Sequence, residues 1–113
     1  MDNINESIKS ALSIDGTIGA ALGDWATGFS LGQASLNDNV FPASKLEQAI
    51  ALNSEVIKAK NRARDGLAIT APIEDILITL ADQYHLIRIC EMAEGGFFYL
   101  VMDREKANLG LAR

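Results

Sequence analysis

Two residues with nucleophilic or metal-binding side chains lie close together in the last third of the sequence, His85 and Cys90. They are the single histidine and the single cysteine of the chain. Side chains five positions apart on a strand point to opposite faces, so this imidazole and this thiol do not form a nucleophile and base pair. Two such ligands are also too few for a zinc site within one chain. We expect neither cysteine catalysis nor a bound metal, and we interpret His85 as a partly buried structural residue.

The glycines at positions 16, 19 and 23 are the next candidates, because glycine-rich loops bind phosphates. A P-loop requires a Gly-Lys pair followed by Ser or Thr, and the sequence contains no Gly-Lys pair. Their spacing does not match GxGxxG, and the segment after them has the pattern of a strand instead of a helix whose N-terminus would bind a pyrophosphate. We interpret them as turn and packing glycines and expect no cofactor.

The acidic residues form no catalytic group either. They are spread over expected loops and helix ends, with Asp2 near Glu6 and the pair Glu74-Asp75 close together in sequence. Ordinary solvated surface acids explain this distribution. We therefore expect no catalytic residue and do not expect the chain to be an enzyme.

Length, charge and composition restrict the kind of protein further. With 113 residues, 49% of them hydrophobic and 22% charged, the chain is expected to fold as a single domain over residues 1–113. Ten basic against fifteen acidic residues give a net charge of −5, which disfavours nucleic acid as a partner. The single cysteine allows no disulfide within the chain and fits a reducing cytoplasm. We expect neither a signal peptide nor insertion into a membrane.

The periodicity of the apolar residues predicts the elements that hold these side chains. A helix over residues 2–13 is indicated by an apolar stripe of Ile4, Ile8, Ala11 and Leu12. The segments TIGAALG and FSLG alternate as the two strands of a hairpin. Small residues at positions 17, 19, 21 and 23 leave room for a helix to lie close against the first strand. Trp25 at the hairpin tip either contacts a partner or packs back on a helix, and packing is the favoured interpretation.

A long helix is expected from Ser44 to about Arg64. Ser44 and Glu47 form the S-x-x-E pattern of a capping box at its start. Its apolar residues form two stripes, one with Leu46, Ile50 and Ile57, and a second, spaced 3, 4, 3 and 4, with Ala49, Leu52, Val56, Ala59 and Ala63. One face against a sheet needs only one stripe. On spacing alone, the second stripe is either part of a wide core face or a contact with another helix.

A second hairpin is expected from ILITLA, a turn at Asp82-Gln83, and YHLIRIC. With Ala81 opposite Tyr84, its register pairs Leu80 with His85, Ile78 with Ile87, and Ile76 with Ile89. The segment FFYLVM is apolar on both faces and predicts a central strand.

Asp103 is expected to cap a last helix in REKANLGLAR. The elements then follow one another in the order α-β-β-α-β-β-β-α. The fold class that results is an α/β (α+β) sandwich, a five-stranded, mainly antiparallel sheet with helices on both faces.

Two stretches of the sequence resemble a known family. SIDGTIGAALGDWATGFSLG at 13–32 and EDILITLADQYHLIRICEMAEGGFFYLVMDREKANLGLAR at 74–113 resemble the Roadblock dynein light chain family in its bacterial and archaeal single-domain form. The most telling parts are the acid-Gly before the first strand, the hairpin ending in Thr27-Gly28, the strand at 83–87 and the closing segment at 103–109. The resemblance implies a Roadblock/longin-type sandwich with strand order 2-1-5-4-3, the long helix on one face and the terminal helices on the other.

The same resemblance implies a homodimer. In this family two long helices pack side by side, and the third strands pair at the edge, so that the two sheets join into one. Carried onto this sequence, the dimer interface consists of Ala49, Leu52, Val56, Ala59 and Ala63 on the helix, with Ile76, Ile78 and Leu80 on or near the joining edge. The second stripe of the long helix then has a partner.

The resemblance also implies a function, because such proteins are scaffolds and regulators of small Ras-like GTPases. Some of them accelerate GTP hydrolysis by the partner without lending an arginine. We therefore expect a dimeric, cytoplasmic adaptor in signalling by protein–protein interaction. Candidate contacts with the GTPase, on the exposed side of the long helices, are Lys45, Gln48, Glu55, Lys58 and Arg62.

The alternative function belongs to another class, a small-molecule or signal sensor domain of a related α/β sandwich type. Such a domain needs a cavity for its ligand. The large residues of FFYLVM, with Ile87 and Ile89 beside them, predict a filled core instead.

Overall fold

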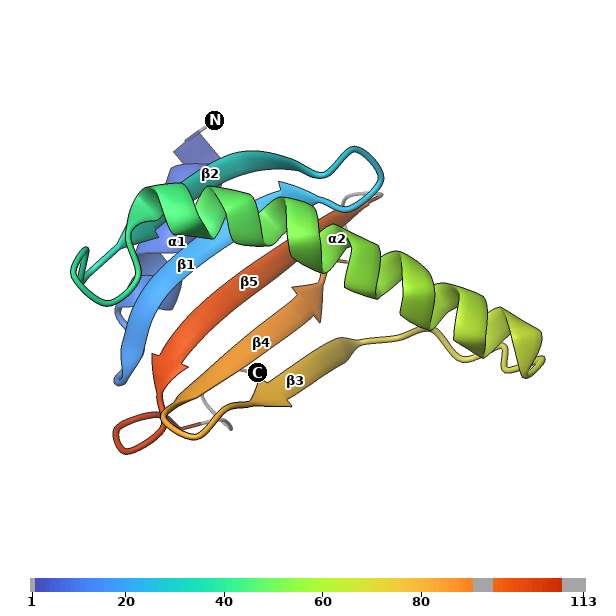
Figure 1. Ribbon diagram of the computed structural model, residues 1–113. Helices are drawn as coiled ribbons and strands as arrows, with labels where there is room; N and C mark the ends of the chain where they lie inside the picture. The colour runs from blue at the N-terminus through green and yellow to red at the C-terminus, as the bar shows by residue number, and fades with distance from the viewer. Residues whose placement is uncertain (1, 91–94, 109–113) are drawn as a thin grey trace.

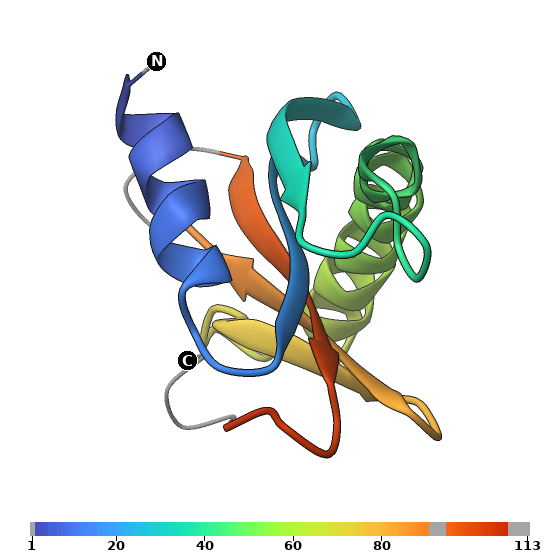
Figure 2. The same cartoon turned by 90° about the vertical axis from the view of Figure 1, so that its left-hand side faces the viewer.

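The helices and strands follow the predicted order over most of the part of the chain that the computed structural model describes, residues 2–90 and 95–108. The elements are α1 (Asp2–Leu12), β1 (Thr17–Asp24), β2 (Phe29–Ser35), α2 (Ala43–Gly66), β3 (Asp75–Thr79), β4 (Gln83–Ile89) and β5 (Gly96–Asp103). The strands form one antiparallel sheet in the order β2-β1-β5-β4-β3. Figures 1 and 2 show α1 on one face of this sheet and α2 on the other. The predicted sheet, its strand order and the placement of helices on both faces are confirmed.

Each face of the sheet has its own hydrophobic core, and the alternation of side chains along β5 contributes to both. Phe97, Tyr99 and Val101 pack with residues of α2, whereas Leu100 and Met102 pack with residues of α1. All five side chains are buried. Because β5 lies between β1 and β4, the prediction that FFYLVM is a central strand is confirmed.

The close approach of α2 to the sheet depends on small residues in β1. A Cβ atom added to Gly19 would lie 3.0 Å from Cδ1 of Leu46, and one added to Gly23 would lie 2.5 Å from Cγ2 of Ile50. Both helix side chains are fully buried. The prediction that a helix lies close against this face of the first strand is therefore confirmed.

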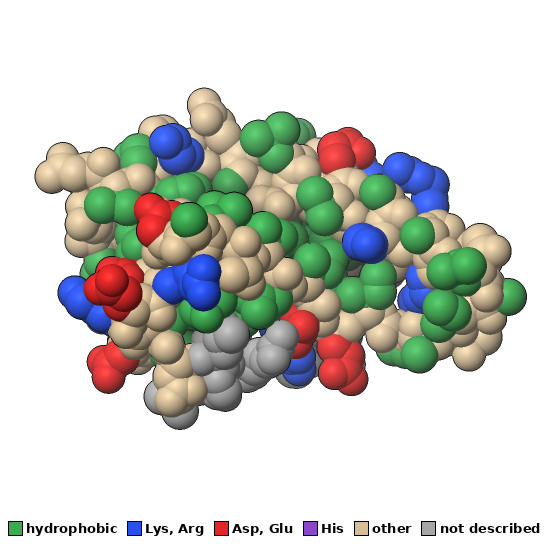
Figure 3. Space-filling model, turned by 60° about the horizontal axis from the view of Figure 1, so that its bottom comes forward, with side chains coloured by type: hydrophobic (Ala, Val, Ile, Leu, Met, Phe, Trp, Pro, Cys, Tyr) green, Lys and Arg blue, Asp and Glu red, His purple; other side chains and the backbone are tan. Residues whose placement is uncertain are grey.

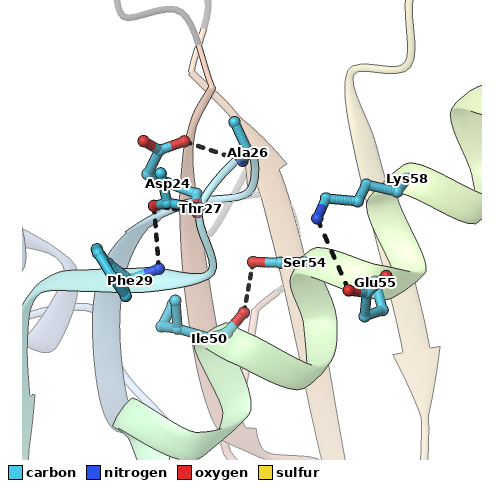
Figure 4. A network of polar contacts seen from close by, with 8 residues as sticks. All are labelled: Asp24, Ala26, Thr27, Phe29, Ile50, Ser54, Glu55 and Lys58. Carbon is cyan, nitrogen blue, oxygen red and sulfur yellow. Dashed lines mark hydrogen bonds and ion pairs between the residues drawn. The ribbon is translucent and has the colours of Figure 1, made fainter.

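Short polar contacts fix the turn between β1 and β2, which lies beside α2 (Figure 4). The Asp24 carboxylate accepts a hydrogen bond from the backbone N–H of Ala26 at 2.9 Å, and the Thr27 hydroxyl accepts one from the N–H of Phe29 at 3.2 Å. Trp25 is half-buried and packs against the core on the α2 face. Packing, the favoured interpretation of this tryptophan, is confirmed.

The start of α2 differs from the prediction. Pro42 is the N-cap residue, with φ at −69° and no side-chain cap hydrogen bond. Its carbonyl accepts hydrogen bonds from the N–H groups of Lys45 and Leu46. The capping box of Ser44 and Glu47 is therefore wrong, because the fixed φ of proline begins the helix before the serine, which already lies inside it.

The β3–β4 hairpin is shifted by two residues from the predicted register. Ile78, expected opposite Ile87, lies opposite His85. The reason is that the two-residue turn lies one position earlier than predicted, at Ala81-Asp82, where the N–H of Leu80 donates a hydrogen bond to the carbonyl of Gln83 at 2.8 Å. A shift of two residues keeps every side chain on its predicted face, so the cores form as expected although the pairs differ.

The last predicted helix does not form over its described part. The Asp103 carboxylate accepts a hydrogen bond from the N–H of Glu105 at 2.9 Å, and its backbone carbonyl accepts one from the N–H of Ala107 at 2.9 Å. These bonds close a turn over residues 104–106, and residues 107 and 108 are not helical. The prediction is wrong there because an aspartate side chain that accepts a hydrogen bond from the backbone N–H two residues later stabilises a turn, which competes with a helix. Residues 109–113, the rest of that prediction, lie outside the described residues.

Candidate interaction surface

His85 is held on the α2 face of the sheet by hydrogen bonds at both ring nitrogens. Its Nε2 lies 2.9 Å from Oε1 of Gln83, and its Nδ1 lies 2.8 Å from the hydroxyl of Tyr99. With the Gln83 oxygen accepting, Nε2 carries the proton and Nδ1 accepts from the Tyr99 hydroxyl, which leaves the ring neutral. The rings of Phe41 and Tyr99 meet the imidazole edge-on, with centroids 5.8 and 5.5 Å away. The interpretation of His85 as a partly buried structural residue is confirmed.

Burial lowers the pKa of His85 below its ordinary value, an effect that the nearby Asp82 carboxylate opposes. The unfolded chain therefore binds the proton more readily than the folded one. The contribution of His85 to stability is complete above its unfolded pKa of about 6.5 and is lost as the pH falls below that value. Burial also raises the pKa of Tyr99 well above its usual range, so that its hydroxyl remains a hydrogen-bond donor throughout.

We therefore expect the free energy of unfolding to decrease as the pH falls from about 7 to about 5.5. The variant His85→Gln does not titrate, and its decrease over the same range is expected to be smaller. Urea denaturation at a series of pH values measures both. An equal pH dependence in the two proteins would show that His85 is not the group responsible.

Among residues 2–90 and 95–108, no group of three or more His, Cys, Asp or Glu side chains could hold a metal ion. Within the same described ranges, no helix is long enough and apolar enough to cross a membrane. The features that stand out on the surface are hydrophobic.

One row of α2 is buried against the sheet and the neighbouring apolar row is largely exposed. Leu46, Ile50 and Ile57 form the buried row. The exposed row, here called the α2 seam, consists of the helix residues predicted for the dimer interface, Ala49, Leu52, Val56, Ala59 and Ala63. Ala49 is buried, but Leu52 is 71% exposed, Val56 is 37% exposed, and both Ala59 and Ala63 are exposed. The second stripe is thus not part of a wide core face, since the single chain leaves most of it in water.

α2 also leaves part of the sheet uncovered. It packs mainly over β1 and β2, whereas β3 and β4 lie below it in Figure 1 and are not covered by it. On this uncovered part, Ile76 and Ile78 are only half-buried although they pack against the core. β3 is the edge strand next to β4, and Leu80, which is 41% exposed, follows just after it. The predicted interface residues Ile76, Ile78 and Leu80 therefore lie on or beside a sheet edge.

Four of the five residues predicted to contact a GTPase share one face of α2. Gln48, Glu55 and Arg62 are spaced by seven residues, and Lys58 stands between the last two, so these four form what we call the outer row. The Lys58 ammonium lies 3.7 Å from the Glu55 carboxylate (Figure 4). The outer row is a charged and polar surface beside the apolar seam.

The fifth residue, Lys45, stands apart from the outer row. It precedes Ala49 by four residues and so extends the α2 seam toward the start of the helix. Its ammonium group lies 5.7 Å from the centre of the Phe41 ring. Lys45 is exposed like most of the other candidate contacts, but it lies in line with the α2 seam and not with the outer row.

An apolar patch at the end of α2 was not predicted from the sequence. Leu67 is 72% exposed and Ile69 is 47% exposed, and we call these two residues the α2 end patch. Figure 3 shows hydrophobic side chains gathered at this end of the molecule, on the right. The Ile69 N–H donates to the Arg64 carbonyl and the Ala68 N–H to the Asp65 carbonyl, both at 3.0 Å, which is the Schellman pattern of a helix end. The patch lies in a connector without periodicity, so no sequence pattern could have indicated it.

A surface depression of about 660 Å³ lies at one end of the sheet, among loops that include Asn37, Asp82 and Arg104. It is outside both hydrophobic cores. Within the core on the α2 face, Phe97 and Tyr99 are at most 1% exposed. These side chains are buried, and the depression, which is open to the surface, is not the internal cavity that a sensor domain would need.

The strand order and the two helices on opposite faces define a known class of domain. A Roadblock/LC7 domain from Streptomyces avermitilis is similar in structure, with 12% sequence identity and a TM-score of 0.75, over 93% of this chain and 81% of that chain. The chain therefore has the Roadblock/LC7 fold, as the resemblance implied.

Two structures of MglB are similar at somewhat higher identity. The gliding protein MglB from Thermus thermophilus is 21% identical with a TM-score of 0.78, over 96% of this chain and 76% of that chain. A structure of MglB with a tetrameric arrangement is 21% identical with a TM-score of 0.80, over 98% of this chain and 77% of that chain. These likenesses establish the fold. No protein-family model and no curated protein matches the sequence.

Proposed function

We propose that this chain is a homodimeric adaptor or regulator of a small Ras-like GTPase or of a related signalling complex. The observation that carries the proposal is the α2 seam, which remains exposed beside a fully buried row of the same helix. Together with the uncovered part of the sheet, it forms an apolar surface that a monomeric protein rarely leaves in water. The resemblance to the Roadblock family supports this proposal, because its members pair through this helix. The tetrameric arrangement of one similar structure, MglB, is in keeping with self-association.

The spacing of the α2 seam suits an antiparallel pair of helices. Ala49 and Ala63 lie seven residues before and after Val56, while Leu52 and Ala59 lie four before and three after it. A two-fold axis near Val56 therefore places Leu52 of one helix beside Ala59 of its partner and Ala49 beside Ala63, while Val56 faces its own copy. Alternating large and small residues allow the two helices to approach closely. β3, at the sheet edge, pairs with its copy in the same dimer.

On this dimer the outer row of each α2 stays exposed and forms the contact surface for the GTPase. It offers hydrogen bonds and charges of both signs, from Gln48, Glu55, Lys58 and Arg62. The chain contributes no catalytic residue in this proposal. Any stimulation of GTP hydrolysis then comes from holding the GTPase's own residues in their active arrangement.

The test is a binding titration with a Ras-like GTPase of the same organism, loaded with GDP or with a non-hydrolysable GTP analogue. We expect binding that depends on the nucleotide, and we expect Arg62→Glu to weaken it by about tenfold, which corresponds to about 1.4 kcal/mol. Lys9→Glu makes an equal charge change at an exposed position of α1 and serves as the control. No effect of Arg62→Glu would contradict the outer row as the contact surface, and equal binding of both nucleotide forms would contradict a regulator that distinguishes them.

A further inference from the structure

The α2 end patch and Lys45 stand at opposite ends of one long helix. α2 has 24 residues and is about 36 Å long at 1.5 Å per residue. Leu67 follows the last seam residue, Ala63, by one helical turn, where α2 runs out beyond the sheet in Figure 1. Lys45 precedes the first seam residue by one turn. The seam therefore continues at both ends, into an apolar patch at one end and a lysine at the other.

The end patch is held in a fixed position by its backbone. Ala68 takes φ of +57°, a conformation that is unfavourable for a residue with a Cβ atom. The hydrogen bonds of Ala68 and Ile69 to the last turn of α2 keep it there. Two large apolar side chains are thus presented to water by a well-defined turn, and their burial would stabilise whatever assembly covers them.

An antiparallel partner brings the two ends of the helix together. Leu67 lies eleven residues after Val56, and Lys45 lies eleven residues before it. With the two-fold axis near Val56, Leu67 of one protomer therefore stands beside Lys45 of the partner subunit. The hydrocarbon stem of Lys45 offers apolar surface, and Val40, which is 44% exposed and adjacent to Phe41, adds to it.

The charges at this meeting point are complementary. The last carbonyl groups of α2 carry partial negative charge, as at the C-terminal end of every helix. The ammonium group of Lys45 of the partner subunit is positive and extends from the first turn of its own helix, beside the Phe41 ring. A second copy of this chain thus supplies both an apolar surface for Leu67 and a cation for the helix end.

We infer that the α2 end patch docks on Lys45 and Val40 of the partner subunit, so that each dimer contains two such contacts. This contact rests on the homodimer proposed above and goes beyond it, because the seam alone does not require the connector between α2 and β3. It also assigns Lys45 to the dimer interface and removes it from the surface that meets a GTPase.

Cysteine cross-linking of the full chain tests the contact in a Cys90→Ser background. The double variant Lys45→Cys/Leu67→Cys carries both positions. Within one chain they lie about 33 Å apart along the helix, too far for a short bis-maleimide, so any cross-link joins two chains. We expect a covalent dimer from the double variant and none from either single variant, because the two copies of each position lie at opposite ends of the dimer. A cross-link through Leu67→Cys alone would indicate parallel helices and overturn the inference.

A Val56→Cys variant separates the failure of this contact from the failure of the dimer. Val56 faces its own copy at the two-fold axis, so its cross-linking reports the homodimer itself. Cross-linked Val56→Cys with an unreacted double variant would overturn the end-patch contact and leave the homodimer standing. No cross-link in either protein, together with a monomeric mass, would overturn both.

The dissociation constant of the dimer gives a second measurement without chemical modification. We expect Leu67→Ser/Ile69→Ser to raise this dissociation constant about tenfold, because each protomer loses the apolar area that these two side chains bury in the dimer. Both residues are exposed in the single chain, so the variant keeps its fold. Gln48→Ser on the outer row is the control, with an unchanged constant. An unchanged constant for the double serine variant would overturn the end-patch contact.

Discussion

Replacing Val56 by glutamate is expected to convert the protein from a dimer to a monomer. Val56 is 37% exposed in the single chain and lies outside the buried core, so the variant keeps its fold. In the proposed dimer it faces its own copy, and two carboxylates would be buried side by side without a compensating charge. Such burial costs several kcal/mol, roughly the whole stability of a moderate dimer. Sedimentation velocity over a concentration series measures the mass of both proteins.

The matched control for this substitution is Gln48→Glu. It adds the same negative charge to α2, but on the exposed outer row, and the mass of the protein is expected to remain that of the dimer. Circular dichroism verifies that both variants are folded. A Val56→Glu protein that still dimerises with the original affinity would contradict the α2 seam as the interface. An unmodified protein that is monomeric at every concentration would contradict the homodimer.

Replacing Gly23 by alanine is expected to destabilise the fold by about 1–3 kcal/mol. The added Cβ atom would lie 2.5 Å from Cγ2 and 2.9 Å from Cδ1 of Ile50, and 3.2 Å from Cε1 of Phe97. Ile50 and Phe97 are fully buried, so either α2 moves away from β1 or these side chains leave their preferred rotamers. Thermal unfolding measures the effect as a Tm lowered by several degrees.

Gly66→Ala is the control for this substitution and is expected to act in the opposite direction. A Cβ atom added to Gly66 meets no atom within 4 Å. Gly66 is the last residue of α2, and alanine favours the helix over glycine by up to about 1 kcal/mol. Its Tm should therefore rise slightly. If Gly23→Ala were as stable as the unmodified protein, the close packing of α2 on β1 would be refuted.

The two faces of the sheet could be predicted from the sequence because their signal is local and repeated. Alternation in TIGAALG and YHLIRIC assigns each side chain to a face, and the apolar run FFYLVM marks the strand that is buried on both faces. The faces were correct even where the β3–β4 register was wrong by two residues, because the pattern has a period of two. Strand order came from the family resemblance, since alternation identifies a face but not a neighbouring strand.

The ends of the helices could not be predicted with the same certainty. Ser44 and Glu47 match a capping box, yet the proline two residues earlier already begins the helix. Asp103 has the side chain of a helix cap, but an aspartate stabilises a turn by the same kind of hydrogen bond. In both places the local sequence pattern is compatible with two backbone conformations, and contacts outside the segment decide which of them forms.

The interaction surface was predictable only in part. Spacing revealed two apolar stripes on α2, but it could not tell which stripe the sheet would cover. Leu46 and Leu52 occupy equally apolar positions in the pattern, and the fold leaves the first fully buried and the second 71% exposed. Leu67 and Ile69 gave no signal at all, because their exposure depends on where the helix runs past the sheet.

β5 lies between β1 and β4 although it is the last of the five strands along the chain. The hairpins β1–β2 and β3–β4 are therefore not neighbours until β5 joins them, and a two-stranded hairpin is only marginally stable alone. On the ribosome, the inner edges of β1 and β4 stay unpaired, in addition to the outer edges of β2 and β3, until residue 103 has left the exit tunnel. Closure of the sheet is thus a late and non-local step, during which those edges depend on protection from other nascent chains.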